Sequence, residues 1–145
     1  MNREEIGSRL RMNEIPFAED LPEKLEIYLR LLLEWNTKMD LTAVEEEEDL
    51  LDKHFADSLT VLRTDLVKPG ASLVDVGTGA GFPGMVLAMA RPDLKITLMD
   101  AQQKRLNFLE AVRKEVGISN VELVHMRAED GGRDPRYREK HKTAA

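Results

Sequence analysis

The sequence predicts an α/β fold: the first half of a doubly wound, Rossmann-like parallel sheet, preceded by a helical segment. Three observations predict it. Residues 1–68 show helical periodicity, residues 72–125 alternate between short apolar strands and helices, and a cluster of glycines follows the first strand. A strand–helix–strand–helix–strand order implies parallel strands with right-handed crossovers. A chain of 145 residues suits one domain with a small addition.

The helical segment contains two amphipathic stretches. In the first, apolar residues recur at three- and four-residue steps, at Leu25, Tyr28, Leu29, Leu32, Trp35 and Met39. The second begins with capping-box spacing between Thr42 and Glu45 and an acidic first turn. Its apolar face is formed by Leu51, Phe55, Leu59 and Leu62. The proline and glycine within residues 68–70 end this helix.

After residue 70 the pattern changes to alternating strands and helices. Strands are predicted over 72–76, 95–99 and 121–125, and helices over 83–90 and 102–116. Gly117 occupies the position in which glycine commonly ends a helix. We therefore expect an N-terminal helical region over 1–68, a partial Rossmann-like domain over 69–132 and a basic C-terminal tail over 133–145. The tail either stays solvated or contacts phosphates.

The composition excludes several classes of protein. Without cysteine there is neither a disulfide scaffold nor a thiolate metal site, and three scattered histidines predict no metal centre. No uncharged stretch is long enough to span a bilayer, and the N-terminus lacks an apolar signal core. We therefore expect a cytoplasmic protein with no membrane partner. The net charge of −6 argues against a protein that coats nucleic acid, although a local basic face remains compatible with it.

The glycines after the first strand lie at positions 77, 79 and 81, which gives the pattern D-x-G-x-G-x-G starting at Asp75. Such a loop lets a ligand approach the backbone closely, and the helix that follows offers free N–H groups. A dinucleotide fingerprint would need a third glycine where this chain has Phe82. The spacing is instead that of methyltransferases that use S-adenosylmethionine. This cofactor has no phosphates, so the loop needs no lysine, and an acid before it suits an ammonium and a sulfonium group.

Acidic residues also follow the next two predicted strands. Asp100 ends the second strand, where a carboxylate can accept hydrogen bonds from both ribose hydroxyls. Ala128 and Glu129 follow the third strand, where an adenine would lie. Acids are also common in turns, so an ordinary turn role stays open for both carboxylates. A second cluster, His54, Asp57 and Ser58, lies on one helix face, but the serine lacks the strand–turn–helix elbow of a hydrolase nucleophile.

Several segments taken together identify a family resemblance. They are Trp35-Asn36, Leu41-Thr42, Lys53-His54-Phe55, Asp57-Ser58-Leu59, the glycine loop from Asp75 to Gly84, Lys104-Arg105, Asn107-Phe108-Leu109 and Arg127-Ala128-Glu129-Asp130. In these segments the chain resembles the bacterial 16S ribosomal RNA guanine-N7 methyltransferases, the glucose-inhibited division protein B family. The resemblance runs from about residue 20 to about residue 138.

The resemblance implies a cofactor site, a substrate and a reaction. The methionine end of S-adenosylmethionine would contact Asp75, Gly77, Gly79 and Phe82, the ribose would bind Asp100, and the adenine would lie by Ala128 and Glu129. The substrate would be 16S ribosomal RNA or the small ribosomal subunit, with guanine N7 as methyl acceptor. Because N7 is already a nucleophile, no strong general base is needed, and the resemblance singles out no catalytic residue.

The family's catalytic domain continues with further strands beyond the point where this chain ends, so we expect a C-terminally truncated member. In the complete sheet the first strand is central. Without its other neighbour, residues 73–76 would form an open apolar edge, which predicts self-association. Two alternatives stay open: a non-enzymatic remnant that binds the cofactor, and a nicotinamide dinucleotide-binding oxidoreductase domain, against which Phe82 argues.

Overall fold

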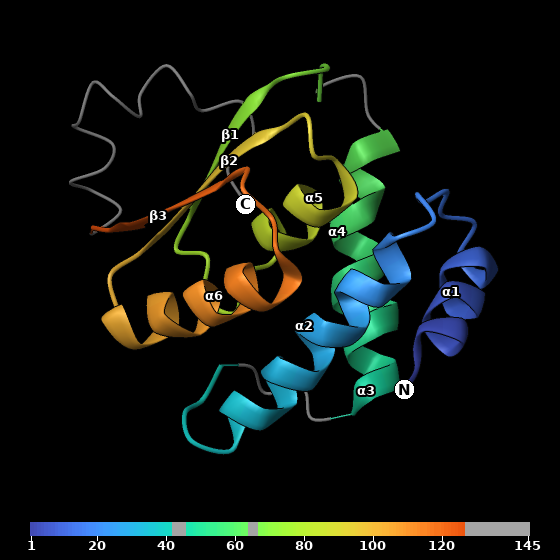
Figure 1. Ribbon diagram of the computed structural model, residues 1–145, viewed down its shortest axis with the longest axis horizontal. Coiled ribbons are helices and arrows are strands. Elements are labelled where there is room, and N and C mark those ends of the chain that lie inside the picture. Colours follow the sequence, from blue (N-terminus) through green and yellow to red (C-terminus); the bar gives the residue numbers. More distant parts are fainter. Residues whose placement is uncertain (42–45, 64–66, 127–145) are drawn as a thin grey trace.

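The computed structural model describes residues 1–41, 46–63 and 67–126, and Figure 1 shows their helices and strands. The predicted capping pair Thr42 and Glu45 and the basic tail over 133–145 lie outside the described residues. Among the residues that are described, no helix combines the length and the apolar composition needed to cross a membrane.

The elements follow the order that the sequence predicts. Their bounds are α1 Arg3–Met12, α2 Leu21–Asn36, α3 Glu47–Asp49, α4 Ala56–Thr60, β1 Ser72–Val76, α5 Gly84–Ala90, β2 Lys95–Asp100, α6 Gln103–Val116 and β3 Val121–His125. A π-helix, η1 (Leu50–Phe55), joins α3 to α4, and the 3₁₀ turn η2 (Val61–Arg63) follows α4. These four pieces form one continuous helical rod, drawn in green in Figure 1. The short helix α1 lies within the region predicted as helical, but its bounds were not evident from the sequence.

Helix α2 buries the apolar face that its sequence predicts. Pro22 lies in its first turn, where a missing N–H is harmless. Tyr28 is fully buried, as are its aliphatic neighbours on the same face. The helix ends at Asn36, earlier than the apolar repeat suggests, so Met39 belongs to the following turn. Side-chain hydrogen bonds explain the early end: Thr37 donates to the Glu34 carbonyl, and the Asn36 side chain accepts from the Leu41 N–H.

The three strands form a parallel sheet in the order β1-β2-β3, which confirms the predicted topology. In its register Val76 lies beside Met99, and Asp100 lies beside His125. The carboxyl ends of the strands therefore meet at one edge of the sheet, where open α/β sheets bind ligands. Within the described residues β1 has a neighbouring strand on one side only. Self-association through that edge stays a prediction.

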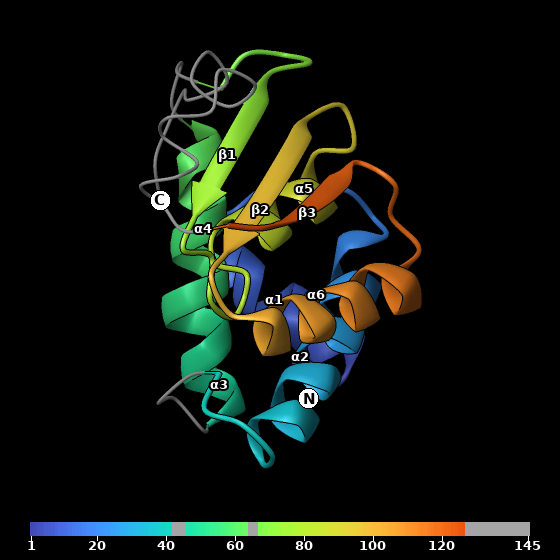
Figure 2. The same ribbon diagram turned by 90° about the vertical axis from the view of Figure 1, so that its left-hand side faces the viewer.

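The helices are arranged in layers on one face of the sheet (Figure 2). Helices α5 and α6 pack directly on the strands, α2 packs on both of these helices, and α4 packs on α5. Helix α1 contacts α2 and η1 and forms the outermost layer. Tyr28, Phe55 and Phe108 are among the largest fully buried side chains, and they come from three different helices. The main core therefore lies between the N-terminal helices and α5 and α6.

A glycine at the start of α5 lets this helix approach the sheet closely. A Cβ atom added at Gly84 would overlap the Leu98 side chain on β2 and lie 2.8 Å from Oδ2 of Asp75 on β1. Both neighbours are buried, so neither can move aside into solvent. Gly84 therefore allows α5 to lie close to both β1 and β2.

Replacing Gly84 with alanine is expected to lower the free energy of unfolding by about 1–3 kcal/mol, because the added methyl group overpacks the interface between helix and sheet. Urea denaturation measures the change. A double-mutant cycle with Leu98→Val, which removes the overlapping Cδ2 atom, provides the control. If Gly84→Ala is as destabilising in the Leu98→Val background as in the wild type, the proposed overlap is wrong.

Candidate functional site

The loop between β1 and α5 is bonded to the end of β2. The backbone N–H groups of Gly77 and Thr78 both donate to the Met99 carbonyl, at 2.8 and 3.0 Å. Gly77, Gly79 and Gly81 have φ angles of 69°, 60° and 102°, which L side chains rarely adopt. A Cβ atom added at Gly77 or Gly79 would have no atom of the described residues within 4 Å. These two glycines therefore face open space, as a cradle for a ligand requires.

The structure brings Asp100 directly to this loop. Its Oδ2 accepts a hydrogen bond from the Gly79 N–H at 2.9 Å, and its Oδ1 accepts from the Gln102 N–H at 2.9 Å. The Arg105 guanidinium lies 3.7 Å from Oδ1. The carboxylate is only 2% exposed, but each of its oxygens has two lone pairs and can accept a further donor. Two of the predicted site elements, the loop and the strand-end acid, are thus adjacent.

Asp75 is bonded to both ends of the glycine loop. Its side chain is buried, and its Oδ2 accepts hydrogen bonds from the Thr78 hydroxyl at 2.8 Å and from the Gly84 N–H at 3.0 Å. These bonds join the start of the loop to the start of α5. Oδ1 has no hydrogen-bond partner in the described part of the chain. In this structure Asp75 holds the two ends of the loop together, and its contact with a cofactor stays a prediction.

Burial raises the pKa of Asp75 to about 6, well above the ordinary value of 3.8 for an aspartate. The hydrogen bonds from Thr78 and Gly84 favour the ionised form and partly oppose this shift, whereas the nearby charge of Asp100 adds to it. In the folded protein Asp75 is therefore about half protonated near pH 6.

Phe82 points toward the N-terminal helices. Its ring is half-buried and stacks on the His54 imidazole, with ring centroids 5.0 Å apart and planes at 16°. The Phe55 and Tyr28 rings lie 5.5 and 5.9 Å from it. The residue that replaces the third glycine of a dinucleotide fingerprint thus serves as a packing contact with η1 and α2. Its contact with the methionine end of a cofactor stays a prediction.

One contact with the loop could not be identified from the sequence. The Tyr28 hydroxyl on α2 donates a hydrogen bond to the Ala80 carbonyl in the middle of the glycine loop. The only signal for it is the presence of a tyrosine within a buried aliphatic helix face, because a buried hydroxyl needs a partner. The other predicted site residues, Ala128 and Glu129, lie outside the described residues.

The cluster of His54, Asp57 and Ser58 does not form a second catalytic site. Ser58 donates its hydroxyl to the backbone carbonyl of His54 at 2.7 Å, and Asp57 is exposed, so the three residues do not form a hydrolase triad. Among the described residues no three acidic or histidine side chains are close enough together to hold a metal ion.

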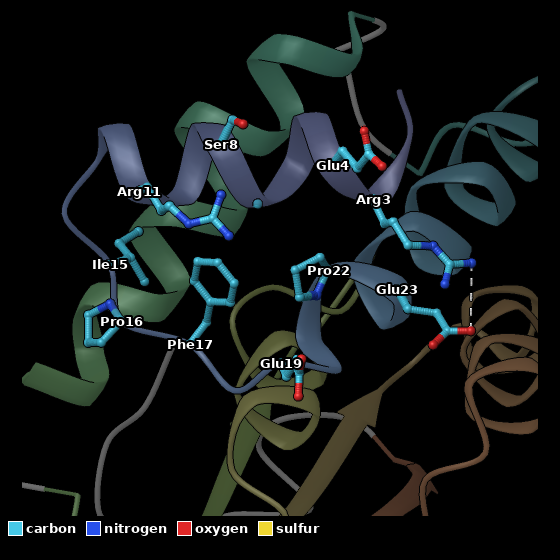
Figure 3. Close-up of a pocket in the computed structure, with 11 residues that line it drawn as sticks. Arg3, Glu4, Ser8, Arg11, Ile15, Pro16, Phe17, Glu19, Pro22 and Glu23 are labelled. Atoms are coloured by element: carbon cyan, nitrogen blue, oxygen red, sulfur yellow. Dashed lines mark ion pairs between the residues drawn. The ribbon is translucent and has the colours of Figure 1, made fainter.

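A cavity of about 670 Å³ lies away from the loop, between α1 and the start of α2 (Figure 3). Arg11 lies over the Phe17 ring, 5.4 Å from its centroid, and Arg3 forms an ion pair with Glu23 at 3.8 Å. The lining mixes two arginines with three glutamates, and these charged side chains are exposed. Such a lining favours neither an anion nor a cation, so the glycine loop is the better candidate site.

Comparison with known proteins gives consistent results. A family model described as rRNA small subunit methyltransferase G (GidB) matches residues 21–143. Ribosomal RNA small subunit methyltransferase G of Clostridium beijerinckii is 48% identical over 136 residues, which cover 94% of this chain and 54% of that protein. The protein of the same name from Thermoanaerobacter sp. strain X514 is 50% identical over 117 residues, 81% of this chain and 49% of that protein. The chain spans about half the length of the curated relatives it matches.

A solved structure shares the fold. It is described as a putative protein-L-isoaspartate O-methyltransferase from Plasmodium falciparum in complex with S-adenosyl-L-homocysteine. The TM-score is 0.57 at 15% sequence identity, and the match covers 96% of this chain and 68% of that one. The likeness confirms the predicted Rossmann-like fold, with helices preceding the parallel sheet.

The raised pKa of Asp75 predicts a pH-dependent contribution to stability. Because its pKa is about 6 when folded and near 3.8 when unfolded, the protonated side chain favours the folded state. This contribution is complete below about pH 4 and is lost as the pH rises through 6, a decrease on the order of 2–3 kcal/mol. Urea denaturation of the wild type and of Asp75→Asn between pH 4 and 7 measures it. Only the wild type should lose this part of the free energy of unfolding as the pH rises. If that free energy depends on pH identically in both proteins, the raised pKa of Asp75 is contradicted.

Proposed function

The chain belongs to the family of rRNA small subunit methyltransferase G, and we propose that it binds S-adenosylmethionine at the glycine loop and transfers the methyl group to ribosomal RNA of the small subunit. The observation that supports this proposal best is the open side of Gly77 and Gly79 beside the Asp100 carboxylate. Both features lie at the carboxyl edge of the parallel sheet, where ligands bind in this class of fold.

The residues of the loop suit the chemistry of this cofactor. S-adenosylmethionine supplies a methyl group on a positively charged sulfur. The Asp100 carboxylate has lone pairs to spare for the two ribose hydroxyls, and its bond to Gly79 keeps it next to the open backbone. Gly77 and Gly79 leave room for the methionine part, since no side chain projects from either of them. Asp75 joins the loop to α5 and adds a carboxyl group close to the loop backbone.

The adenine end of the cofactor would lie beyond β3. We assign it to Ala128 and Glu129, which follow that strand in the sequence. The parallel register supports this assignment, because the end of β3 lies beside the end of β2 and Asp100 pairs with His125. A ribose at Asp100 would thus be flanked on one side by the glycine loop and on the other by the end of β3.

For the acceptor we propose N7 of a guanine. This nitrogen carries an available lone pair, so methyl transfer needs no base to remove a proton. The protein then has to hold the sulfur, the methyl group and N7 in line, an effect of position that can contribute roughly 7–11 kcal/mol. A half-buried His54 stacked on Phe82 lies beside the loop, but nothing in this chemistry requires it to act as a base.

The other two interpretations differ in what they predict for binding and transfer. A dinucleotide-binding oxidoreductase would need close backbone approach where Phe82 now packs against the helices. A non-enzymatic member would bind the cofactor without transferring its methyl group. Ligand binding distinguishes the first alternative, and a transfer assay distinguishes the second.

Asp100→Asn is expected to weaken the binding of S-adenosylhomocysteine by roughly 10-fold or more, because an amide loses a charged acceptor for the ribose hydroxyls. Isothermal titration calorimetry measures it. Asp93→Asn is the matched control: Asp93 also accepts a backbone N–H, that of Gly70 at 2.9 Å, and also contacts an arginine, but it precedes β2 at the opposite end of that strand. Equal affinities for all three proteins, or wild-type binding of NAD instead, would contradict the proposed site.

The transfer itself is tested with tritiated S-adenosylmethionine and small ribosomal subunits that lack the family's methylation. Radioactivity in the ribosomal RNA, with N7-methylguanine after nuclease digestion, is the expected result. Asp100→Asn serves as the variant that should transfer more slowly. Cofactor binding without any incorporation would support the non-enzymatic alternative and overturn the proposed activity.

A further inference from the structure

We infer that Tyr28 is a positioning residue for the cofactor loop: its hydroxyl on helix α2 holds the Ala80 carbonyl and thereby fixes the loop in the conformation that binds the cofactor. The inference rests on the proposed function only in naming S-adenosylmethionine as the ligand of that loop. It gives the N-terminal helical region a part in the cofactor site, although that region precedes the sheet in the sequence.

The contact is long-range and fully buried. Tyr28 lies in the middle of α2 with 0% of its surface exposed, and its partner is 52 positions further along the chain. Ala80 itself is only 5% exposed. Water therefore cannot replace the hydroxyl easily, and a carbonyl left without its donor would lose a buried hydrogen bond.

The tyrosine ring and the loop fit each other at Gly81. A Cβ atom added at this glycine would lie 2.5 Å from the Tyr28 hydroxyl oxygen and 2.9 Å from Leu109. Gly81 also has a φ angle of 102°, which a residue with a side chain would resist. The hydroxyl thus sits where a side chain at residue 81 would be, and it can reach the Ala80 carbonyl because that side chain is missing.

The ring is locked in place from several sides. It stacks on Phe55 of η1 at 5.2 Å and 17°, and it contacts Phe82 of the loop at 5.9 Å and Phe108 of α6 at 6.3 Å. Burial, followed by the charge of Asp75, raises the pKa of Tyr28 well above its usual value, so the hydroxyl keeps its proton and remains a donor. A fixed ring with a permanent donor can set the position of its acceptor.

The Tyr28 bond and the Asp100 bond act on neighbouring residues of the loop. Asp100 accepts the Gly79 N–H from the side of β2, and Tyr28 donates to the Ala80 carbonyl from the side of α2. The loop is therefore held between the sheet and the N-terminal helices. Loss of the Tyr28 hydroxyl releases one side, and the flexible glycines then have to be ordered by the ligand at the expense of affinity.

The decisive variant is Tyr28→Phe, which keeps the ring and its aromatic contacts and removes only the hydroxyl. We expect roughly 3- to 30-fold weaker binding of S-adenosylhomocysteine by isothermal titration calorimetry, the range for loss of one buried hydrogen bond. The matched control is Leu25→Ala, which removes buried volume from the same helix one turn earlier. It should lower the melting temperature at least as much while changing the affinity less than about twofold.

Hydrogen exchange in the absence of ligand gives a second, independent readout. In Tyr28→Phe, exchange of the peptide covering residues 77–84 should become faster while that of β2 stays unchanged. In Leu25→Ala the loop should not be affected selectively. The inference is overturned if Tyr28→Phe leaves both the affinity and the exchange of the loop at wild-type values, or if Leu25→Ala reproduces both effects. Should the wild type bind no S-adenosylhomocysteine, the proposed function fails, and hydrogen exchange still decides whether Tyr28 holds the loop.

Discussion

The backbone between β1 and α5 is hydrogen-bonded on two sides at once, and the candidate site depends on that constraint. From the sheet, the Met99 carbonyl accepts the first N–H groups of the loop and Asp100 accepts the Gly79 N–H. From the helices, Tyr28 donates to the Ala80 carbonyl. A chain that meets both sets of partners must turn sharply, which explains why three of its residues are glycines with positive φ. The N-terminal helices are therefore part of the support of the loop rather than a separate addition.

Two buried aspartates lie at this loop, and their surroundings separate their roles. Asp75 receives only neutral donors, the Thr78 hydroxyl and the Gly84 N–H, and burial raises its pKa to about 6. Asp100 receives two backbone N–H groups and has the Arg105 guanidinium within 3.7 Å. The bond from the Gly79 N–H keeps the Asp100 carboxylate beside the open side of the loop, which suits the proposed contact with ribose hydroxyls. Asp75 joins the start of the loop to the start of α5 through Oδ2, while its buried Oδ1 has no hydrogen-bond partner among the described residues.

Local signals predicted the strands, the bounds of α5 and α6 to within one residue, and the meeting of the loop with Asp100. Alternating apolar residues and glycine or proline at the ends are properties of short segments, and parallel strands place their carboxyl ends together whatever lies elsewhere. The contacts across layers were not predictable. A tyrosine on a helix face can donate to any carbonyl nearby, so its bond to Ala80 follows only from how α2 packs. Likewise, the need for glycine at 84 depends on the distance between α5 and β2.

The hydrogen bonds that hold the loop leave the space beside Gly77 and Gly79 open. The Met99 and Asp100 contacts reach it from β2, the Tyr28 contact reaches it from α2, and the space that side chains at Gly77 and Gly79 would fill stays open. Ordering a glycine-rich segment costs more conformational entropy than ordering other residues. In this fold the loop is already ordered by its hydrogen bonds. A ligand that enters the open side would therefore meet a preformed surface and would bind without the entropic cost of ordering the loop. A loop with the same glycines but without the Tyr28 bond would lack this advantage, so in our proposal α2 supports the cofactor site as much as the strands do.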